Sequence, residues 1–279
     1  MKYSYILPIR NRADLLRRGL QSYDCMDYDK DNFEVVIADY MSEDNIKGVI
    51  NEFRGRLNIK YLCIDPRRYV YHKVGFHKGN CNPALAQNVA VVEADGEFII
   101  MTSPEILQWK GNLKNLDMVE GLKDKFLYGK VIEKSEKEFF NTVNHFDIMN
   151  TMDSPQVLCD WEKVLKSVTL YFIGVMAKSK FIKYGGIDEK YMCAIAYDDE
   201  DFGKRMEKCP DLELVFDKNV FGVHLTHDRS YQEYSVIEPN LNYLNSKEKD
   251  GIQNHLVANK NIKLGDPEVL IERSQMWRY

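Results

Sequence analysis

The first hundred residues alternate short apolar runs with stretches whose apolar residues recur every three or four positions. A short apolar run is typical of a buried strand, and the helical spacing is typical of an amphipathic helix that covers a sheet. Because each predicted helix lies between two predicted strands, the pattern indicates βα units and a mainly parallel central sheet flanked by helices. The predicted strands are 3–7, 33–38, 59–64 and 97–101, and the predicted helices are 13–23, 46–53 and 83–94.

The second half of the chain is less regular. We find no internal repeat, low-complexity tract or linker, so we expect one α/β domain at residues 1–230. The polar and aromatic tail, residues 231–279, is expected to form a helical extension packed on that domain. The other predicted elements are helices at 109–122 and 198–208, strands at 126–132, 169–177, 212–216 and 220–223, and a helix stop at Gly185 and Gly186.

Charge and hydropathy exclude several classes of protein. The 38 basic and 43 acidic side chains give a net charge of −5, so we expect no nucleic-acid partner and no strongly basic membrane patch. The apolar stretches are far shorter than the roughly 20 residues that a membrane helix needs, so we expect no transmembrane segment. The first residues do not resemble a signal peptide, and the expected location is therefore the cytoplasm.

Polar side chains follow three of the predicted strands at their carboxyl ends, where α/β proteins form ligand sites. Arg10 and Arg12 follow the first strand, and their forked donors suit phosphate oxygens, although two solvated arginines are an equally good interpretation. Asp39 follows the second strand and is suited either to hydrogen bonds from a nucleoside or to a turn before a helix. Glu105 follows the fourth strand as a hard oxygen ligand, or as an ordinary surface glutamate.

Two further patterns suit metal and acid–base chemistry. His224 and His227 follow a predicted strand, and imidazoles with a carboxylate suit a first-row divalent metal such as Mn²⁺; the alternative is one packed and one solvated histidine. Residues 198–201 (DDED) open a predicted helix, and crowded carboxylates raise one another's pKa, which suits a general base. In the alternative, these carboxylates only cap the helix, with Asp201 and Arg205 as an i,i+4 ion pair.

Taken in order, these segments resemble the nucleotide-sugar glycosyltransferases of the GT-A fold, in particular family 2 and the β-1,4-galactosyltransferase-like group. The resemblance covers about residues 3–228 and implies a Rossmann-like α/β fold for them, to which the expected helical C-terminal extension is added. The matching segments are 6–12 (ILPIRNR), 33–44 (FEVVIADYMSED), 86–90 (AQNVA), 94–99 (ADGEFI), 185–191 (GGIDEKY) and 198–205 (DDEDFGKR).

The resemblance also implies roles for individual residues. Asp199 falls on the catalytic base and Asp198 on its neighbour that holds the acceptor, while His224 and His227 fall on metal-binding positions. Where the family has D-x-D, this chain has Ser103-Pro104-Glu105, so Glu105 is the expected carboxylate ligand of the metal. The residues expected at the nucleotide sugar are Pro8, Arg10, Arg12, Asp39, Asn88, Ser103 and Gly186.

The function implied is inverting transfer of a sugar from a nucleotide diphosphate sugar, expected to be UDP-linked, to a hydroxyl of a glycan or lipid-linked glycan. Mn²⁺ is the expected cofactor, with Mg²⁺ as the alternative. The implied setting is bacterial polysaccharide biosynthesis in the cytoplasm or at the inner face of the membrane. The changed metal motif keeps two alternatives open, an inactive nucleotide-sugar-binding relative and a metal-independent transferase. Donor sugar, linkage and oligomeric state stay open.

Overall fold

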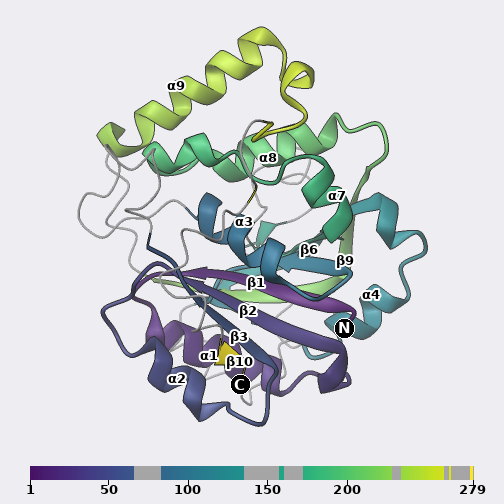
Figure 1. The fold of residues 1–279 in the computed structure, drawn as a ribbon. Helices are drawn as coiled ribbons and strands as arrows, with labels where there is room; N and C mark the ends of the chain where they lie inside the picture. The colour runs from purple at the N-terminus through teal and green to yellow at the C-terminus, as the bar shows by residue number, and fades with distance from the viewer. Residues whose placement is uncertain are drawn as a thin grey trace.

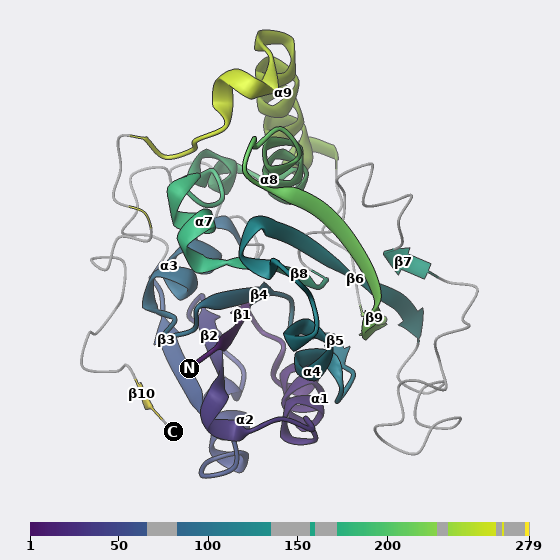
Figure 2. The ribbon, with the colours of Figure 1, turned by 90° about the vertical axis from the view of Figure 1, so that its right-hand side faces the viewer.

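A central β-sheet with helices on both faces forms the body of the protein, as Figure 1 and Figure 2 show. The computed structural model describes residues 1–65, 83–134, 157–159, 172–227, 234–260, 264 and 277–278. Within these residues the sheet contains both parallel and antiparallel pairs of strands. The architecture is therefore α/β, as the sequence predicts.

The first half of the chain forms the parallel part of the sheet. Its elements are β1 (Tyr3–Ile9), α1 (Ala13–Asp24), β2 (Phe33–Asp39), α2 (Ile46–Glu52), β3 (Ile59–Cys63), α3 (Ala84–Glu93) and β4 (Phe98–Met101). β1 pairs in parallel with β2 and β4, and β2 pairs in parallel with β3. β2 is buried along its whole length, as expected for a strand between helical layers. Figure 1 shows α1 and α2 below the sheet and α3 above it.

The second half completes the sheet with mixed pairing. Its elements are β5 (Ile106–Gln108), α4 (Asn112–Asp117), β6 (Lys125–Lys134), β7 (Val157–Cys159), β8 (Gly174–Ala177), α7 (Lys178–Lys183), α8 (Asp198–Glu207) and β9 (Glu213–Leu225). β8 is antiparallel to both β4 and β6, whereas β6 and β9 are parallel. β5 is antiparallel to β9, which brings the start of β5 beside the end of β9.

Two predictions for this half need correction, and a third is tested only in part. The predicted helix at 109–122 is reduced to α4, and the three residues of β5 lie just before its expected start. The two strands predicted at 212–216 and 220–223 are one strand, β9. Its pairing with β6 shifts register between Gly129 and Lys130, and this irregularity accommodates the polar residues that separate the two apolar runs. β8 covers only the end of the strand predicted at 169–177, whose first residues lie outside the described part.

The C-terminal part contributes a helix and one short strand. α9 (Tyr234–Asp250) packs against α8 and the 3₁₀ turn Glu189–Cys193, and β10 (Trp277–Arg278) pairs antiparallel with β3. The strand order is therefore β10-β3-β2-β1-β4-β8-β6-β9-β5, with β7 on β6. Among the helices that the structure describes, none combines the length and apolarity needed to cross a bilayer.

Candidate functional site

One carboxylate and two imidazoles meet where β5 lies against β9. In this antiparallel pair Ile106 is opposite His224, and the backbone N–H of Leu225 donates to the Glu105 carbonyl at 2.9 Å. This register places Glu105 beside His224 and His227. One ligand atom of each of these three side chains lies within 4.8 Å of the others. The three residues that the sequence analysis assigned to a metal are therefore brought together.

The Glu105 carboxylate is buried beside one guanidinium and two imidazoles. Its Oε1 lies 3.0 Å from Arg12 Nη1, 3.3 Å from His227 Nε2 and 3.9 Å from His224 Nε2. Burial acts to raise the pKa of Glu105, but the His227 hydrogen bond and the charges of Arg12 and the histidines outweigh it and lower the pKa to about 2. The carboxylate is therefore ionised at neutral pH.

The second oxygen of Glu105 provides a test of whether a metal fits this site. Oε2 is buried and accepts no hydrogen bond from the residues that the structure describes. A buried acceptor without a partner is costly, and a bound cation would remove that cost. Two imidazoles and one carboxylate form a donor set that suits a first-row divalent ion. The residues present therefore fit a divalent metal.

Arg10 and Arg12 lie at the carboxyl end of β1, as predicted, but in different surroundings. Arg12 directly precedes α1 and reaches Glu105, so its guanidinium is part of the metal-candidate cluster. Arg10 donates to the Tyr40 carbonyl at 2.5 Å and lies 3.9 Å from Glu43, so it joins β1 to the loop after β2.

Pro8 and Ser103 also lie at or just after strand ends, as predicted. Pro8 is the penultimate residue of β1 and is opposite Ala38 of β2. Ser103 lies between β4 and β5, and its carbonyl accepts from the Ile106 N–H at 3.1 Å, which closes the turn that carries Glu105.

Asp39 is buried at the end of β2, where both of its carboxylate oxygens accept hydrogen bonds. Oδ1 accepts from the Ser42 N–H at 2.9 Å and the Ser42 hydroxyl at 2.5 Å, and Oδ2 accepts from the Tyr61 hydroxyl at 2.7 Å. Burial raises the pKa of Asp39, although these hydrogen bonds oppose the shift. The cap of α2 is Asn45, whose side chain accepts from the Gly48 N–H, so Ser42 is left to bind Asp39. Asp39 therefore holds the loop at the sheet edge.

Asn88 and Gly186 hold a loop against α3. The buried Asn88 amide donates to the Ile187 carbonyl at 2.8 Å and to Glu189 Oε1 at 3.0 Å, and its oxygen accepts from the Ile187 N–H at 3.0 Å. Gly186 has a φ of +62°, and a Cβ there would lie 2.5 Å from Asn88 Oδ1. Both residues were expected at the nucleotide sugar. In the structure their polar groups serve the loop that precedes the acidic pair.

The acidic pair Asp198 and Asp199 opens α8 after a turn with unusual backbone geometry. Ala196 and Tyr197 have φ values of +65° and +66°, a conformation that costs a non-glycine residue roughly 1–2 kcal/mol. Asp198 is buried, and Asp199 Oδ1 accepts from the Glu200 N–H at 2.9 Å. Burial and the neighbouring Asp198 charge raise the pKa of Asp199 well above its usual value, which suits a proton acceptor.

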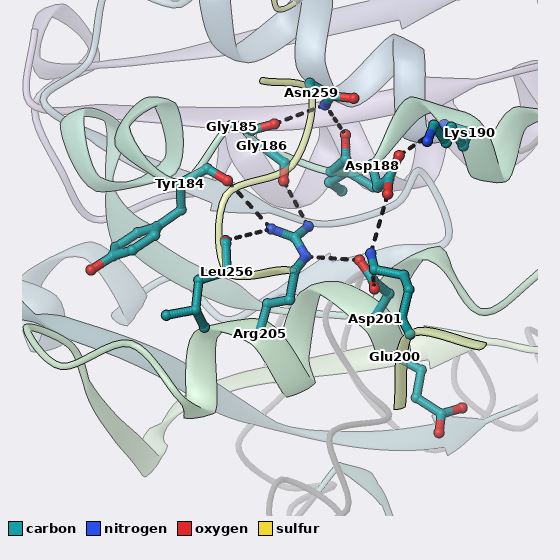
Figure 3. Close-up of polar contacts among 12 residues, drawn as sticks. Tyr184, Gly185, Gly186, Asp188, Lys190, Glu200, Asp201, Arg205, Leu256 and Asn259 are labelled. Atoms are coloured by element: carbon teal, nitrogen blue, oxygen red, sulfur yellow. Dashed lines mark hydrogen bonds and ion pairs between the residues drawn. The ribbon is translucent and has the colours of Figure 1, made fainter. Parts of the chain in front are cut away.

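A buried ionic network anchors α8 behind this pair (Figure 3). Arg205 Nε donates to Asp201 at 2.8 Å, which confirms the predicted i,i+4 ion pair. Lys247 of α9 contacts the Asp201 carboxylate from the other side. The Arg205 guanidinium also donates to three carbonyls, those of Gly186 at 2.8 Å and of Tyr184 and Leu256 at 3.3 Å.

Sequence reasoning missed the contribution of α9 to this network. Lys247 also pairs with Asp188 at 3.1 Å, and the Tyr243 hydroxyl donates to the same carboxylate at 2.8 Å. Both residues belong to a polar helix, a composition that is usually typical of a solvent-facing surface. The available signal was their spacing, because Tyr243 and Lys247 lie four residues apart on one helical face.

Comparison with known proteins identifies sequence relatives. No protein-family model matches the chain. The chain is 28% identical over 115 residues to the poly(ribitol-phosphate) β-N-acetylglucosaminyltransferase TarS of Staphylococcus aureus. This match covers 41% of the chain but only 18% of the relative, so the chain corresponds to a small part of that protein.

Solved structures share the fold. The structure of S. aureus TarS 1–349 with UDP matches with a TM-score of 0.60 at 18% identity, covering 88% of this chain and 65% of that one. The complex of TarS 1–349 with UDP-GlcNAc gives 0.58 at 19% identity, covering 92% and 72%. Mannosyltransferase PcManGT of Pyrobaculum calidifontis, in complex with GDP-Man and Mn²⁺, gives 0.56 at 18% identity, covering 91% and 68%. The chain therefore has the GT-A-type fold of these glycosyltransferases.

Proposed function

We propose that this chain is a glycosyltransferase that uses a nucleotide diphosphate sugar, UDP-linked, as donor. The observation that carries the proposal is the cluster of Glu105, His224, His227 and Arg12 at the sheet edge. A sheet edge in an α/β fold is a common ligand site, and the cluster combines metal ligands with a phosphate-binding side chain. The shared fold adds support, because structures with that fold contain UDP, UDP-GlcNAc, or GDP-Man with Mn²⁺.

The donor diphosphate would lie against this cluster. Arg12 and Arg10 would bind phosphate oxygens through their forked N–H donors, and Asp39 would hold the loop that faces the nucleoside. Glu105, His224 and His227 would hold a divalent ion, with Mn²⁺ preferred and Mg²⁺ as the alternative. When bound, that ion supplies positive charge that neutralises the diphosphate as it departs.

Asp199 would act as general base in an inverting transfer. The acceptor hydroxyl gives its proton to the Asp199 carboxylate while its oxygen forms the new bond to C1 of the sugar. The bond between C1 and the diphosphate oxygen breaks, and the nucleoside diphosphate leaves with the electron pair. Attack on the face opposite the leaving group inverts the configuration at C1. Asp198, next to Asp199, would bind the acceptor.

The acceptor and subtype extend the same proposal. The relation to a poly(ribitol-phosphate) β-N-acetylglucosaminyltransferase of a bacterium supports a glycan or polysaccharide acceptor in bacterial polysaccharide biosynthesis. The pair His224 and His227, three residues apart beside a carboxylate, supports the resemblance to the β-1,4-galactosyltransferase-like group.

Donor binding and donor turnover test the proposal. We expect calorimetry to show tighter UDP binding with Mn²⁺ than with EDTA, and UDP release when UDP-GlcNAc or another UDP-sugar is incubated with the protein. Asp199→Asn should retain UDP binding and lose turnover, whereas Glu207→Gln, at the exposed far end of α8, should retain both. UDP binding without turnover of any donor would identify a nucleotide-sugar-binding protein. Turnover unchanged by EDTA would identify a metal-independent transferase.

A further inference from the structure

One face of α9 lies against the segment that leads into α8, and Figure 1 and Figure 2 both show the two helices side by side. This face consists of Asn240, Tyr243, Leu244 and Lys247, whose spacing of three and four residues puts them on one side of a helix. Asn240, Leu244 and Lys247 are each at most 3% exposed. A polar helix therefore buries selected polar groups against the domain.

Asn240 bridges the two ends of the loop before α8. Its Nδ2 donates to the Tyr191 carbonyl at 2.8 Å and to the Ala196 carbonyl at 2.9 Å. Both hydrogens of the amide are thus used, and they join the middle of the 3₁₀ turn to the residue that begins the left-handed turn. No other residue type of this size provides two such donors without a charge.

The turn that Asn240 holds determines where α8 begins. Ala196 and Tyr197 both have positive φ, which non-glycine residues keep only where the surrounding structure enforces it. The Tyr197 carbonyl accepts from the Asp201 N–H at 3.0 Å, which is the first hydrogen bond of α8. Asp198 and Asp199 lie within that first turn. A change at Ala196 therefore changes the direction in which the Asp199 carboxylate points.

We propose that Asn240 is a positioning residue for Asp199, acting through the turn at Ala196 and Tyr197. The proposal rests on the proposed function, because it takes Asp199 as the proton acceptor. It assigns to α9 a part in the transfer step that is separate from donor binding, since the hydrogen bonds of Asn240 with described residues go to Tyr191 and Ala196 and not to the Glu105 cluster.

The test compares Asn240→Ala with Asn242→Ala, which removes the same side chain from an exposed position two residues further along α9. We expect Asn240→Ala to lower kcat for UDP-GlcNAc hydrolysis by roughly 10- to 100-fold, because small misplacements of a reacting group have effects of that size. UDP affinity in Mn²⁺ should stay within about twofold of that of the unmutated protein, since the substitution removes no side chain that is proposed to contact the donor. Asn242→Ala should change neither quantity.

Two further measurements separate positioning from folding. Hydrogen exchange of the amides at 196–200 should become faster in Asn240→Ala and not in Asn242→Ala. Adding Ala196→Gly to Asn240→Ala should restore part of kcat, because glycine adopts positive φ without strain. If Asn240→Ala does not fold, Asn240→Ser replaces it, since serine is too short to bridge the two carbonyls.

The outcomes that overturn the proposal are distinct from failure of the proposed function. Equal kcat in Asn240→Ala and Asn242→Ala would overturn it, and so would a parallel loss of kcat, UDP affinity and thermal stability. If the unmutated protein turns over no UDP-sugar, the proposed function fails. In that case, unchanged hydrogen exchange at 196–200 in Asn240→Ala would show that Asn240 does not hold the turn. Faster exchange in that variant would show that Asn240 holds the turn even though the proposed function is wrong.

Discussion

Arg205→Met should lower the free energy of unfolding by about 4 kcal/mol, although Arg205 is only one of many charged residues on α8. The guanidinium is fully buried, and it donates to Asp201 and to the carbonyls of Gly186, Tyr184 and Leu256. Removing one member of a buried ion pair costs roughly 3–5 kcal/mol, because the remaining charge is left without a partner.

Two remaining contacts reduce this free-energy cost, and two lost contacts increase it. Lys247 still neutralises Asp201, and the Tyr184 carbonyl still accepts from the Ala258 N–H at 3.1 Å. The buried carbonyl of Gly186 loses a charged donor, at about 1–3 kcal/mol for an unsatisfied buried group, and the partly exposed carbonyl of Leu256 loses one at smaller cost. Because these effects oppose each other, we expect a loss near the middle of the 3–5 kcal/mol range, at about 4 kcal/mol. With roughly 2–4 °C lost per kcal/mol in a chain of this size, Tm should fall by about 8–16 °C.

Urea unfolding followed by circular dichroism measures this loss. The control is Arg17→Met, which removes a partly exposed arginine that pairs with Glu52 and Asp14 at the surface and should change stability by at most about 1 kcal/mol. Arg205→Lys retains the charge without the fork and should lie between the two. A loss below about 1 kcal/mol in Arg205→Met, equal to that of Arg17→Met, would refute the reasoning.

Three other predictions address the site. Asp199→Asn should abolish UDP-sugar turnover and raise the free energy of unfolding at pH 8, because it removes a buried negative charge beside Asp198. The sign follows because the pKa of Asp199 in the folded protein is raised from its ordinary 3.8 to about 8, so the unmutated protein loses stability as pH rises between these two values. Urea unfolding at several pH values measures this loss, and equal pH dependence in Asp199→Asn and the unmutated protein would contradict it. Glu105→Ala and His227→Ala should each weaken Mn²⁺-dependent UDP binding at least about tenfold, and His224→Ala should weaken it less. Equal UDP affinity with and without Mn²⁺ in the unmutated protein, measured by calorimetry, would contradict this prediction. Truncation after Asn245 removes Lys247 and should lower Tm, so an unchanged Tm, size and activity would show that the tail has no structural role.

The parallel half of the fold could be predicted because each of its elements has a strong local pattern. β2 is apolar or buried throughout, and the buried residues of α1 recur at helical spacing. β5 was missed because three residues are too few for a period to appear. β9 was predicted as two strands because its apolar runs are separated by polar residues, and only the pairing with β6 shows that the strand continues.

The metal-candidate cluster could be predicted for a different reason. Glu105 and the two histidines adjoin strand ends, and an α/β sheet brings strand ends to one edge. Asn88 shows the limit of this reasoning, because a buried amide near the edge can serve either a ligand or a loop. The roles of Asn240 and Lys247 could not be predicted, since their partners are 44 to 59 residues away and no local pattern encodes such pairs.

The contacts made by the C-terminal part also affect the order in which this protein can be completed on the ribosome. The parallel strands and the Glu105 cluster use residues up to His227, whereas the loop carrying Gly185 waits for Asn259, whose amide donates to the carbonyls of Gly185 and Ile187. Contacts to Asn259 form late, because this residue is synthesised after every residue of the Glu105 cluster. A nascent chain would thus assemble its donor-side residues before its acidic pair is fixed, which would postpone catalytic competence until synthesis has passed residue 259.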